Sequence, residues 1–163
     1  LPEYWLLPEL WLLPELWLFL NRCANHGANH SSLIRIRIMT TTITGGCYCG
    51  DIRFKAEAET THSTICHCSN CRRAAGAQSV AFVTVPSTDF ALTKGKSTEF
   101  LTETKAIRTF CGRCGSSLTY VGDDRKHEID IHAGCLDHPE NFPPNKDFYV
   151  DEKLPWVPLG RLE

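Results

Sequence analysis

The sequence lacks a long uninterrupted apolar segment, an excess of basic charge and any long stretch of helical periodicity. Its 163 residues carry 17 Lys and Arg against 19 Asp and Glu, which makes the formal net charge −2. A chain with this balance has no basic stripe that could hold nucleic acid by counterion release, so we expect no nucleic-acid partner. The missing helical periodicity favours a protein built mainly of β-strands.

An apolar segment at the start of the sequence consists of three copies of a six-residue unit, over residues 1–18. Pro8, Glu9, Pro14 and Glu15 interrupt it, which leaves no run of about 20 apolar residues to span a bilayer. A secretory signal needs a basic start and an unbroken apolar region, and the segment has neither. We therefore expect no membrane association and a cytoplasmic location.

Methionine is scarce, and the single one is Met39. We interpret residues 1–38 as a low-complexity N-terminal extension, disordered or a gene-model artefact, and residues 39–163 as one domain. The alternative for residues 1–38 is a genuine amphipathic segment that lies at an interface.

Cysteine, by contrast, is abundant, with nine residues. Seven of them fall into three groups of close spacing: Cys47 and Cys49; Cys66, Cys68 and Cys71; Cys111 and Cys114. C-x-C and C-x-x-C spacings are typical of metal ligands in a reducing compartment rather than of disulfides.

Seven thiols are one short of two closed four-cysteine sites, but they suffice for one closed site and one open site. The two outer pairs combine most simply into a structural Cys₄ zinc site. The middle triplet would then hold a second zinc with a free position for water or substrate, as catalytic zinc sites do. We therefore take the triplet Cys66, Cys68 and Cys71 as the candidate catalytic site.

Other residues near these groups have competing interpretations. His67 would face away from two flanking ligands on extended backbone, which makes it the weaker ligand candidate. Cys135 is an eighth ligand, a nucleophile or a buried small apolar residue. Asp130 and His132 share one face of a predicted strand, where they serve proton transfer or form an ordinary core pair.

Short segments with strand-like patterns follow one another along the domain. The C-x-C pair is predicted on extended backbone, and residues 72–76 are predicted as one helical turn that Gly76 closes. Residues 98–102 and 106–110 are predicted to pair as a hairpin. The full set of predicted strands is 51–56, 63–65, 79–85, 90–93, 98–102, 106–110, 117–121 and 128–133.

The order of these motifs resembles the glutathione-dependent formaldehyde-activating enzyme family, which includes centromere protein V. The resemblance covers residues 43–157. It is carried by G-G-C-x-C-G at 45–50, C-H-C-x-x-C-R-R at 66–73, F-C-x-x-C-G at 110–115, A-G-C-L-D at 133–137 and L-P-W at 154–156.

The resemblance implies a β-tent fold, in which short antiparallel sheets surround two zinc sites. It also implies the activity of a carbon–sulfur lyase that joins formaldehyde to glutathione, or cleaves S-(hydroxymethyl)glutathione. The structural zinc would lie at Cys47, Cys49, Cys111 and Cys114, and the catalytic zinc at Cys66, Cys68 and Cys71. Small-molecule thiol and aldehyde substrates are thus the expected partners.

Two further points concern the substrate. Arg72 and Arg73 are candidates to bind the carboxylates of glutathione, with a solvated helix face as the alternative. Cys135 stands where the family more often has Thr or Ser, which allows a different substrate. The competing functions are a non-catalytic zinc-stabilised binding module and a methionine sulfoxide reductase-like enzyme that uses Cys135.

Overall fold

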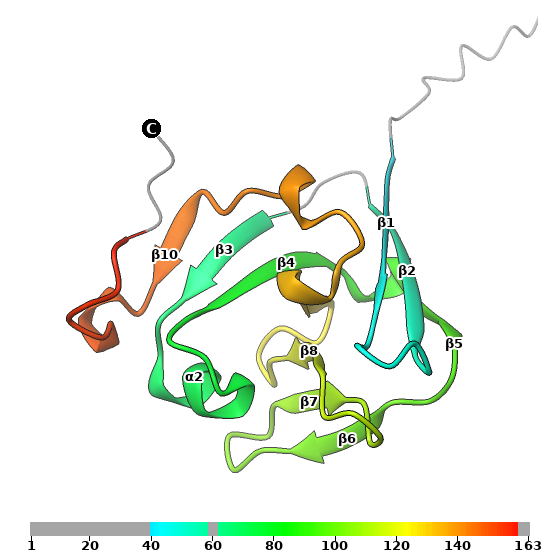
Figure 1. Cartoon of the computed structure of the whole chain (residues 1–163), viewed down its shortest axis with the longest axis horizontal. Coiled ribbons are helices and arrows are strands. Elements are labelled where there is room, and N and C mark those ends of the chain that lie inside the picture. The colour runs from blue at the N-terminus through cyan, green and yellow to red at the C-terminus, as the bar shows by residue number, and fades with distance from the viewer. Residues whose placement is uncertain (1–39, 59–61, 160–163) are drawn as a thin grey trace, which may run out of the picture. The chain divides into compact units, whose positions relative to one another are not determined.

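The computed structural model describes residues 40–58 and 62–159, and these form a mainly β structure, as predicted. The interpretation of residues 1–38 falls outside the described residues. Figure 1 shows the ribbon. The strands are β1 (Thr41–Gly46), β2 (Arg53–Ala58), β3 (His62–Cys66), β4 (Val80–Pro86), β5 (Phe90–Lys94), β6 (Thr98–Leu101), β7 (Ile107–Phe110), β8 (Ser117–Val121), β9 (Glu128–His132) and β10 (Lys146–Phe148).

Helical structure among the described residues is short. It comprises the α-helix α2 (Ser69–Ala75) and the 3-10 helices η1 (Ser87–Asp89), η2 (Ala133–Cys135), η3 (Pro139–Asn141) and η4 (Val150–Glu152). Helix α2 ends at Gly76 in the left-handed conformation, with φ of 62°, as predicted for the residue that closes it. No helix in residues 40–58 and 62–159 is long and apolar enough to cross a bilayer.

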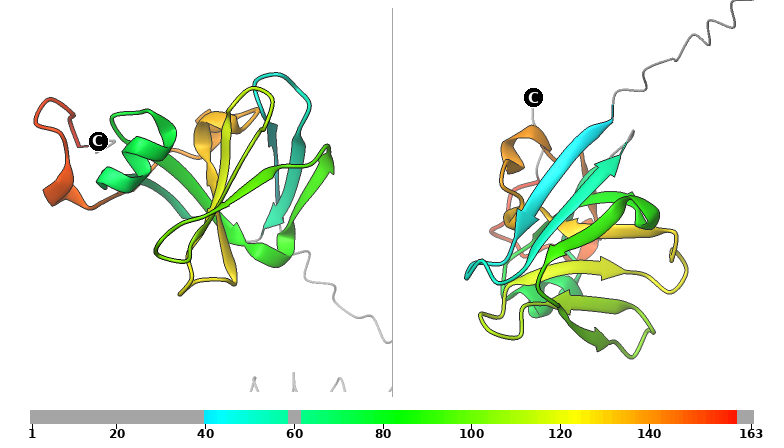
Figure 2. Two further views of the ribbon diagram at one scale, coloured as in Figure 1. Left: turned by 90° about the horizontal axis from the view of Figure 1, so that it is seen from below. Right: turned by 90° about the vertical axis from the view of Figure 1, so that its right-hand side faces the viewer.

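The strands form two sheets. A three-stranded sheet has the order β1-β2-β5, and a seven-stranded sheet has the order β10-β3-β4-β9-β8-β7-β6. The predicted hairpin is confirmed, because β6 and β7 pair antiparallel. All the pairs are antiparallel except that between β10 and β3, which joins segments about 80 residues apart in parallel. Figure 2 shows the small sheet beside the large one.

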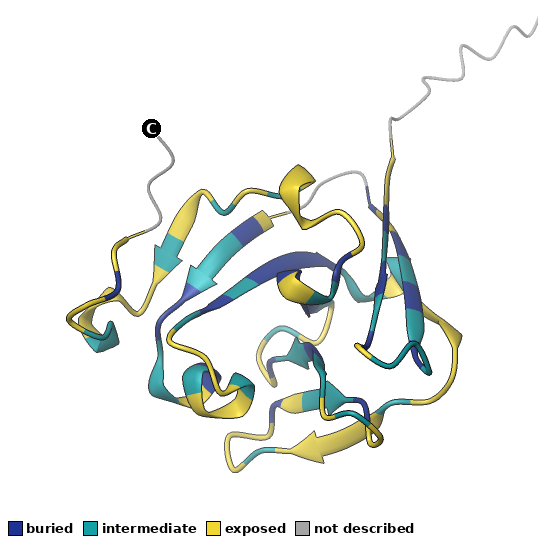
Figure 3. Cartoon of the chain, in the orientation of Figure 1, coloured by how far each residue is buried: buried dark blue, intermediate teal, exposed yellow. Residues whose placement is uncertain are grey.

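The main core lies between these sheets. Strand β2 alternates between exposed or half-buried and buried residues, so that Phe54, Ala56 and Ala58 point inward. They meet Val83 and Ile131 from the centre of the large sheet, and all five are essentially inaccessible to solvent. Figure 3 shows β4 buried along most of its length and the edge strand β6 exposed.

Two strands and one local conformation differ from the predictions made from the sequence. Strands β1 and β10 were not predicted, and β10 is only three residues long. The backbone at Cys47–Gly50 is a turn, closed by a hydrogen bond from the Gly50 N–H to the Cys47 carbonyl (3.1 Å), so the prediction of extended backbone there is wrong. The chain must reverse here to let β2 pair with β1, and only a turn achieves that in so few residues.

Candidate metal centres

The first cysteine cluster joins the two sheets. Cys47 and Cys49 lie on the turn between β1 and β2, and Cys111 and Cys114 lie on the turn between β7 and β8. Figure 2 shows these turns side by side (left view). The four sulfurs all lie within 4.8 Å of one another, so the structure brings together the four cysteines that were predicted to share a metal.

Each of these turns carries a glycine directly after its second cysteine. Gly50 has φ of 75° and Gly115 has φ of 77°, in the left-handed region that other residues adopt only with strain. The Gly115 N–H donates to the Cys111 carbonyl (2.8 Å), as the Gly50 N–H does to the Cys47 carbonyl. The bond at Gly115 closes a five-residue turn and the bond at Gly50 closes a four-residue turn. Each turn ends at a left-handed glycine and carries two of the four cysteines.

Polar contacts between the two turns fix their positions relative to each other. Arg113 Nη1 contacts both oxygens of Asp51 at 2.9 Å, and the Tyr48 N–H donates to Ser116 Oγ at 3.0 Å. Ser116 Oγ also lies 3.3 Å from Cys114 Sγ, and this hydrogen bond is the largest cause of a lowered pKa of Cys114, about 5. The thiolate form that a metal requires is thereby favoured.

The second cluster is formed by Cys66, Cys68 and Cys71, whose sulfurs also lie within 4.8 Å of one another. Cys66 is the last residue of β3, Cys68 is the N-cap of α2, and Cys71 lies in the first turn of that helix. Cys66 and Cys71 are buried, and Cys68 is half-buried. Among the described residues, no fourth His, Cys, Asp or Glu completes this group.

The donor chemistry of both clusters fits zinc. Four ligands at the usual Zn–S distance of 2.3 Å from a tetrahedral centre lie about 3.8 Å apart. The Cys47 and Cys49 sulfurs are 3.5 Å apart, and the Cys49 and Cys111 sulfurs are 3.8 Å apart. Backbone N–H groups of Ile52 and Cys71 donate to Cys47 Sγ and Cys68 Sγ respectively, both at 3.3 Å, and such bonds stabilise negative sulfur. Both clusters can therefore bind a metal ion.

Arg108, on β7, was not predicted to take part. Its Nη2 donates to Cys71 Sγ at 3.4 Å, and its guanidinium carbon lies 4.7 Å from the centre of the Tyr120 ring. Hydrogen bonds from Cys66 and then from Arg108 lower the pKa of Cys71 to about 5, against the effect of burial. No cysteine-motif spacing points to Arg108, because β7 reaches α2 only through the fold.

His67, between two of the clustered cysteines, is directed elsewhere. Its ring is fully buried, and its Nε2 lies 2.7 Å from Asp147 Oδ1 on β10. The His67 N–H donates to the Phe148 carbonyl at 3.0 Å, and the Ser69 N–H donates to Glu152 Oε2 at 2.8 Å. Residues 146–152 therefore hold the loop that carries the three cysteines, a role that no sequence motif in this segment predicts.

The two candidate substrate arginines lie on α2 in different environments. Arg72 is half-buried, and its Nε donates to the His67 carbonyl at 3.0 Å. Arg73 is exposed. Arg72 thus stabilises the cysteine loop, while Arg73 is accessible to a ligand.

Cys135 and the pair Asp130 and His132 lie outside both groups. The half-buried Cys135 thiol donates to the Ser117 carbonyl at 3.0 Å, and burial raises its pKa to about 11. Asp130 accepts hydrogen bonds from Thr84 and Arg125, at 2.6 and 2.7 Å. His132 is buried with its ring edge-on to Phe82, and burial lowers its pKa to about 4.

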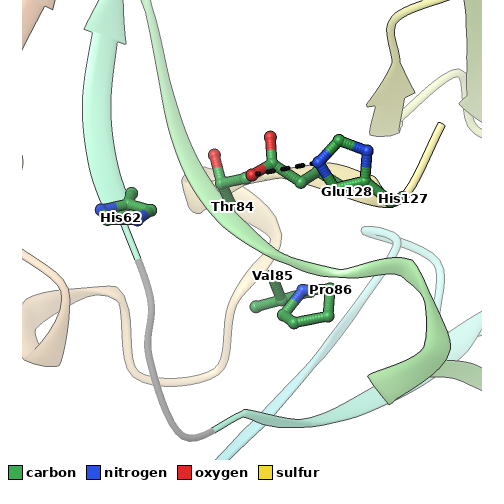
Figure 4. A pocket seen from close by; sticks show the side chains of 6 residues that line it. All are labelled: His62, Thr84, Val85, Pro86, His127 and Glu128. Carbon is green, nitrogen blue, oxygen red and sulfur yellow. Dashed lines mark ion pairs between the residues drawn. The ribbon is translucent and has the colours of Figure 1, made fainter. Parts of the chain in front are cut away.

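A small cavity of about 120 Å³ lies near the start of β3, whereas the three-cysteine cluster begins at the end of that strand (Figure 4). His62, Thr84, Val85, Pro86, His127 and Glu128 line it. It adjoins neither cluster and is too small for a typical ligand.

Comparisons with known proteins agree with the resemblance. The family model described as glutathione-dependent formaldehyde-activating enzyme matches residues 42–152. A protein of Schizosaccharomyces pombe (strain 972) named as an uncharacterized lyase is 29% identical over 111 residues, which cover 67% of this chain and 79% of that protein. A crystal structure of a Rhodobacter sphaeroides protein has the same fold, with a TM-score of 0.55 at 22% identity, and the match covers 64% of this chain and 99% of the other.

Proposed function

Because the chain belongs to the glutathione-dependent formaldehyde-activating enzyme family, we propose that it is a carbon–sulfur lyase. Its reaction joins an aldehyde to a thiol, or cleaves the resulting S-hydroxymethyl adduct, with formaldehyde and glutathione as the substrates that the family name suggests. The observation that carries the proposal is the three-sulfur cluster, which has no fourth protein ligand in the described part of the chain.

The two clusters have different roles in this proposal. Cys47, Cys49, Cys111 and Cys114 hold a structural zinc that links the sheets, since four protein ligands leave no position for substrate. Cys66, Cys68 and Cys71 hold the second zinc with one position open. A zinc ion bound there supplies Lewis acidity, which stabilises thiolate at neutral pH and polarises a carbonyl oxygen.

The chain's own residues organise that open position. Cys66 and Cys71 are anchored by β3 and α2, while the hydrogen bond between His67 and Asp147 orders the loop between them. Arg73 is exposed two residues after Cys71, where it can pair with a carboxylate at the far end of glutathione. Arg72, already bonded to the His67 carbonyl, is the weaker contact.

The reductase alternative has less support from the structure. A nucleophilic cysteine needs thiolate character and access, but Cys135 is half-buried, donates its proton to a carbonyl and has a raised pKa. The raised pKa leaves little thiolate at neutral pH. The binding-module alternative requires that a fourth protein group occupy the second site.

The test combines metal analysis with turnover. We expect two zinc ions per chain, one of which gains a fourth sulfur when glutathione is added, as measured by X-ray absorption at zinc. Adduct formation followed by NMR should exceed the uncatalysed rate. Cys68→Ser should abolish that acceleration, whereas the matched variant Cys135→Ser should keep it.

Each outcome separates the alternatives. Zinc-loaded protein that leaves the rate of adduct formation at its buffer value would refute this substrate assignment. A second zinc with four protein ligands in the absence of glutathione would favour the binding module. Methionine sulfoxide reduction that disappears in Cys135→Ser would favour the reductase.

A further inference from the structure

The Arg108 guanidinium is held beside the three-cysteine cluster by two contacts. Its Nη2 donates to Cys71 Sγ at 3.4 Å, and its guanidinium carbon lies over the Tyr120 ring, 4.7 Å from the ring centre. Because the guanidinium is rigid and planar, these contacts also determine where its other terminal nitrogen lies. Nη1 therefore has a defined position next to the sulfur cluster.

That nitrogen has no acceptor within residues 40–58 and 62–159. Nη1 is buried and makes no hydrogen bond with any described residue. A buried charged donor without a partner is costly, so such an atom calls for an explanation. An acceptor supplied by a ligand would remove the cost.

The neighbouring carboxylate, that of Asp130, is not the acceptor of this nitrogen in the structure. Arg108, Tyr120 and Asp130 lie in a row across β7, β8 and β9. Asp130 Oδ1 accepts from Thr84 Oγ1, and its Oδ2 accepts from Arg125 Nη2. Each Asp130 oxygen thus already accepts from another donor, and Arg108 Nη1 bonds to neither of them.

We propose that Arg108 contacts the substrate, and that its Nη1 donates to the oxygen on the carbon that becomes bonded to the substrate sulfur. This inference rests on the proposed function. The thiolate sulfur forms the C–S bond with an electron pair, the carbonyl π pair moves to oxygen, and that oxygen then takes a proton from water; cleavage reverses these steps. Nη1 stabilises the negative charge while it is on oxygen.

The position of Arg108 argues for this oxygen rather than for the carboxylates of glutathione. Nη1 shares one carbon with the nitrogen that bonds Cys71 Sγ, so its acceptor must lie close to the sulfur cluster. The glutathione carboxylates are several bonds from its sulfur. The exposed Arg73 is better placed for them.

The test compares two small thiols of similar size, mercaptoacetate and ethanethiol, of which only mercaptoacetate carries an anionic oxygen. Their dissociation constants are measured by calorimetry on the full-length, zinc-loaded chain. The wild type should prefer mercaptoacetate, and Arg108→Met should reduce that preference at least about tenfold, the effect of losing one charged hydrogen bond. The control Lys126→Met removes a positive charge from an exposed side chain and should keep the wild-type ratio.

Turnover gives a second readout. Arg108→Met should lower kcat for adduct formation roughly 100-fold or more, as loss of an oxyanion donor does, with little change in KM for the thiol. If Arg108→Met loses zinc, Arg108→Lys is used instead. Lysine keeps a positive charge near Cys71 but lacks the second planar nitrogen. The preference for mercaptoacetate over ethanethiol should therefore still fall.

The outcomes distinguish this inference from the proposed function. An unchanged mercaptoacetate preference in the zinc-loaded Arg108 variant overturns the inference, even if adduct formation is catalysed. A preference that depends on Arg108 in a protein that fails to accelerate adduct formation supports the anion contact and overturns the lyase assignment.

Discussion

Removing the hydrogen bond between His67 and Asp147 tests how the three-cysteine cluster is stabilised. We predict that Asp147→Ala weakens zinc binding at this cluster and leaves the four-cysteine cluster unchanged. His67 lies between Cys66 and Cys68, and its Nε2 loses its Asp147 partner in the variant. Its Nδ1 is already buried without a hydrogen bond among the described residues.

The magnitude follows from burial. The His67 side chain is 1% exposed and that of Asp147 is 11% exposed, so water does not readily replace the lost acceptor. Leaving a buried donor unpaired costs about 1–3 kcal/mol, which corresponds to roughly 5- to 150-fold in an equilibrium constant. Loss of groups that orient metal ligands typically lowers metal affinity by about 10–100-fold, which is the same range.

The assay is stepwise removal of zinc by a competing chelator of known affinity, with metal release recorded for each site. The four-cysteine cluster serves as an internal reference within the same molecule. Asp151→Ala is the matched control, because Asp151 is an exposed acidic residue of the same C-terminal segment. Equal weakening of both sites, or no weakening of the three-cysteine site, would refute the reasoning.

Two further predictions concern stability. The pKa of His132 is about 4, mainly because of burial and then because of Arg108, with Asp130 opposing. In the unfolded chain the pKa of His132 is about 6.5, so between pH 6.5 and 4 the unfolded state binds more protons than the folded state. The folded protein therefore loses about 3 kcal/mol of stability as the pH falls from 6.5 towards 4. Urea denaturation of wild type and His132→Gln from pH 4.5 to 7 should show a shallower decline for the variant, and parallel curves would contradict this. Cys111→Ser, which removes a ligand between the sheets, should release one zinc and lower the melting temperature by on the order of 10 °C, more than Cys68→Ser does; equal shifts in thermal denaturation would count against the structural role.

Several features of the fold followed from local patterns. Alternation in residues 51–56 predicted most of β2, and the segment 117–121 predicted β8 with its observed bounds. The predicted hairpin of 98–102 and 106–110 formed because its strands are close in sequence. In contrast, the short strand β10 has little pattern of its own, since it is extended only through its pairing with β3.

By itself, the sequence determined which residues could act as ligands. Sulfurs two or three residues apart, as in Cys66, Cys68 and Cys71, reach one another through the local backbone alone, and the count of seven thiols indicated one closed group and one open group. Motif order was also sufficient to point to the family.

Only the tertiary structure decided what surrounds those ligands. Arg108 contacts Cys71 from 37 residues away, and Asp147 contacts His67 from 80 residues away. Such contacts depend on the tertiary fold. Strand β10 pairs directly with β3, whereas β7 lies four strands from β3 in the sheet order and comes close to α2 only through the course of the whole sheet. Because local spacing contains no information about that fold, the sequence identified the sulfurs, and the fold supplied the charge and the hydrogen bonds around them.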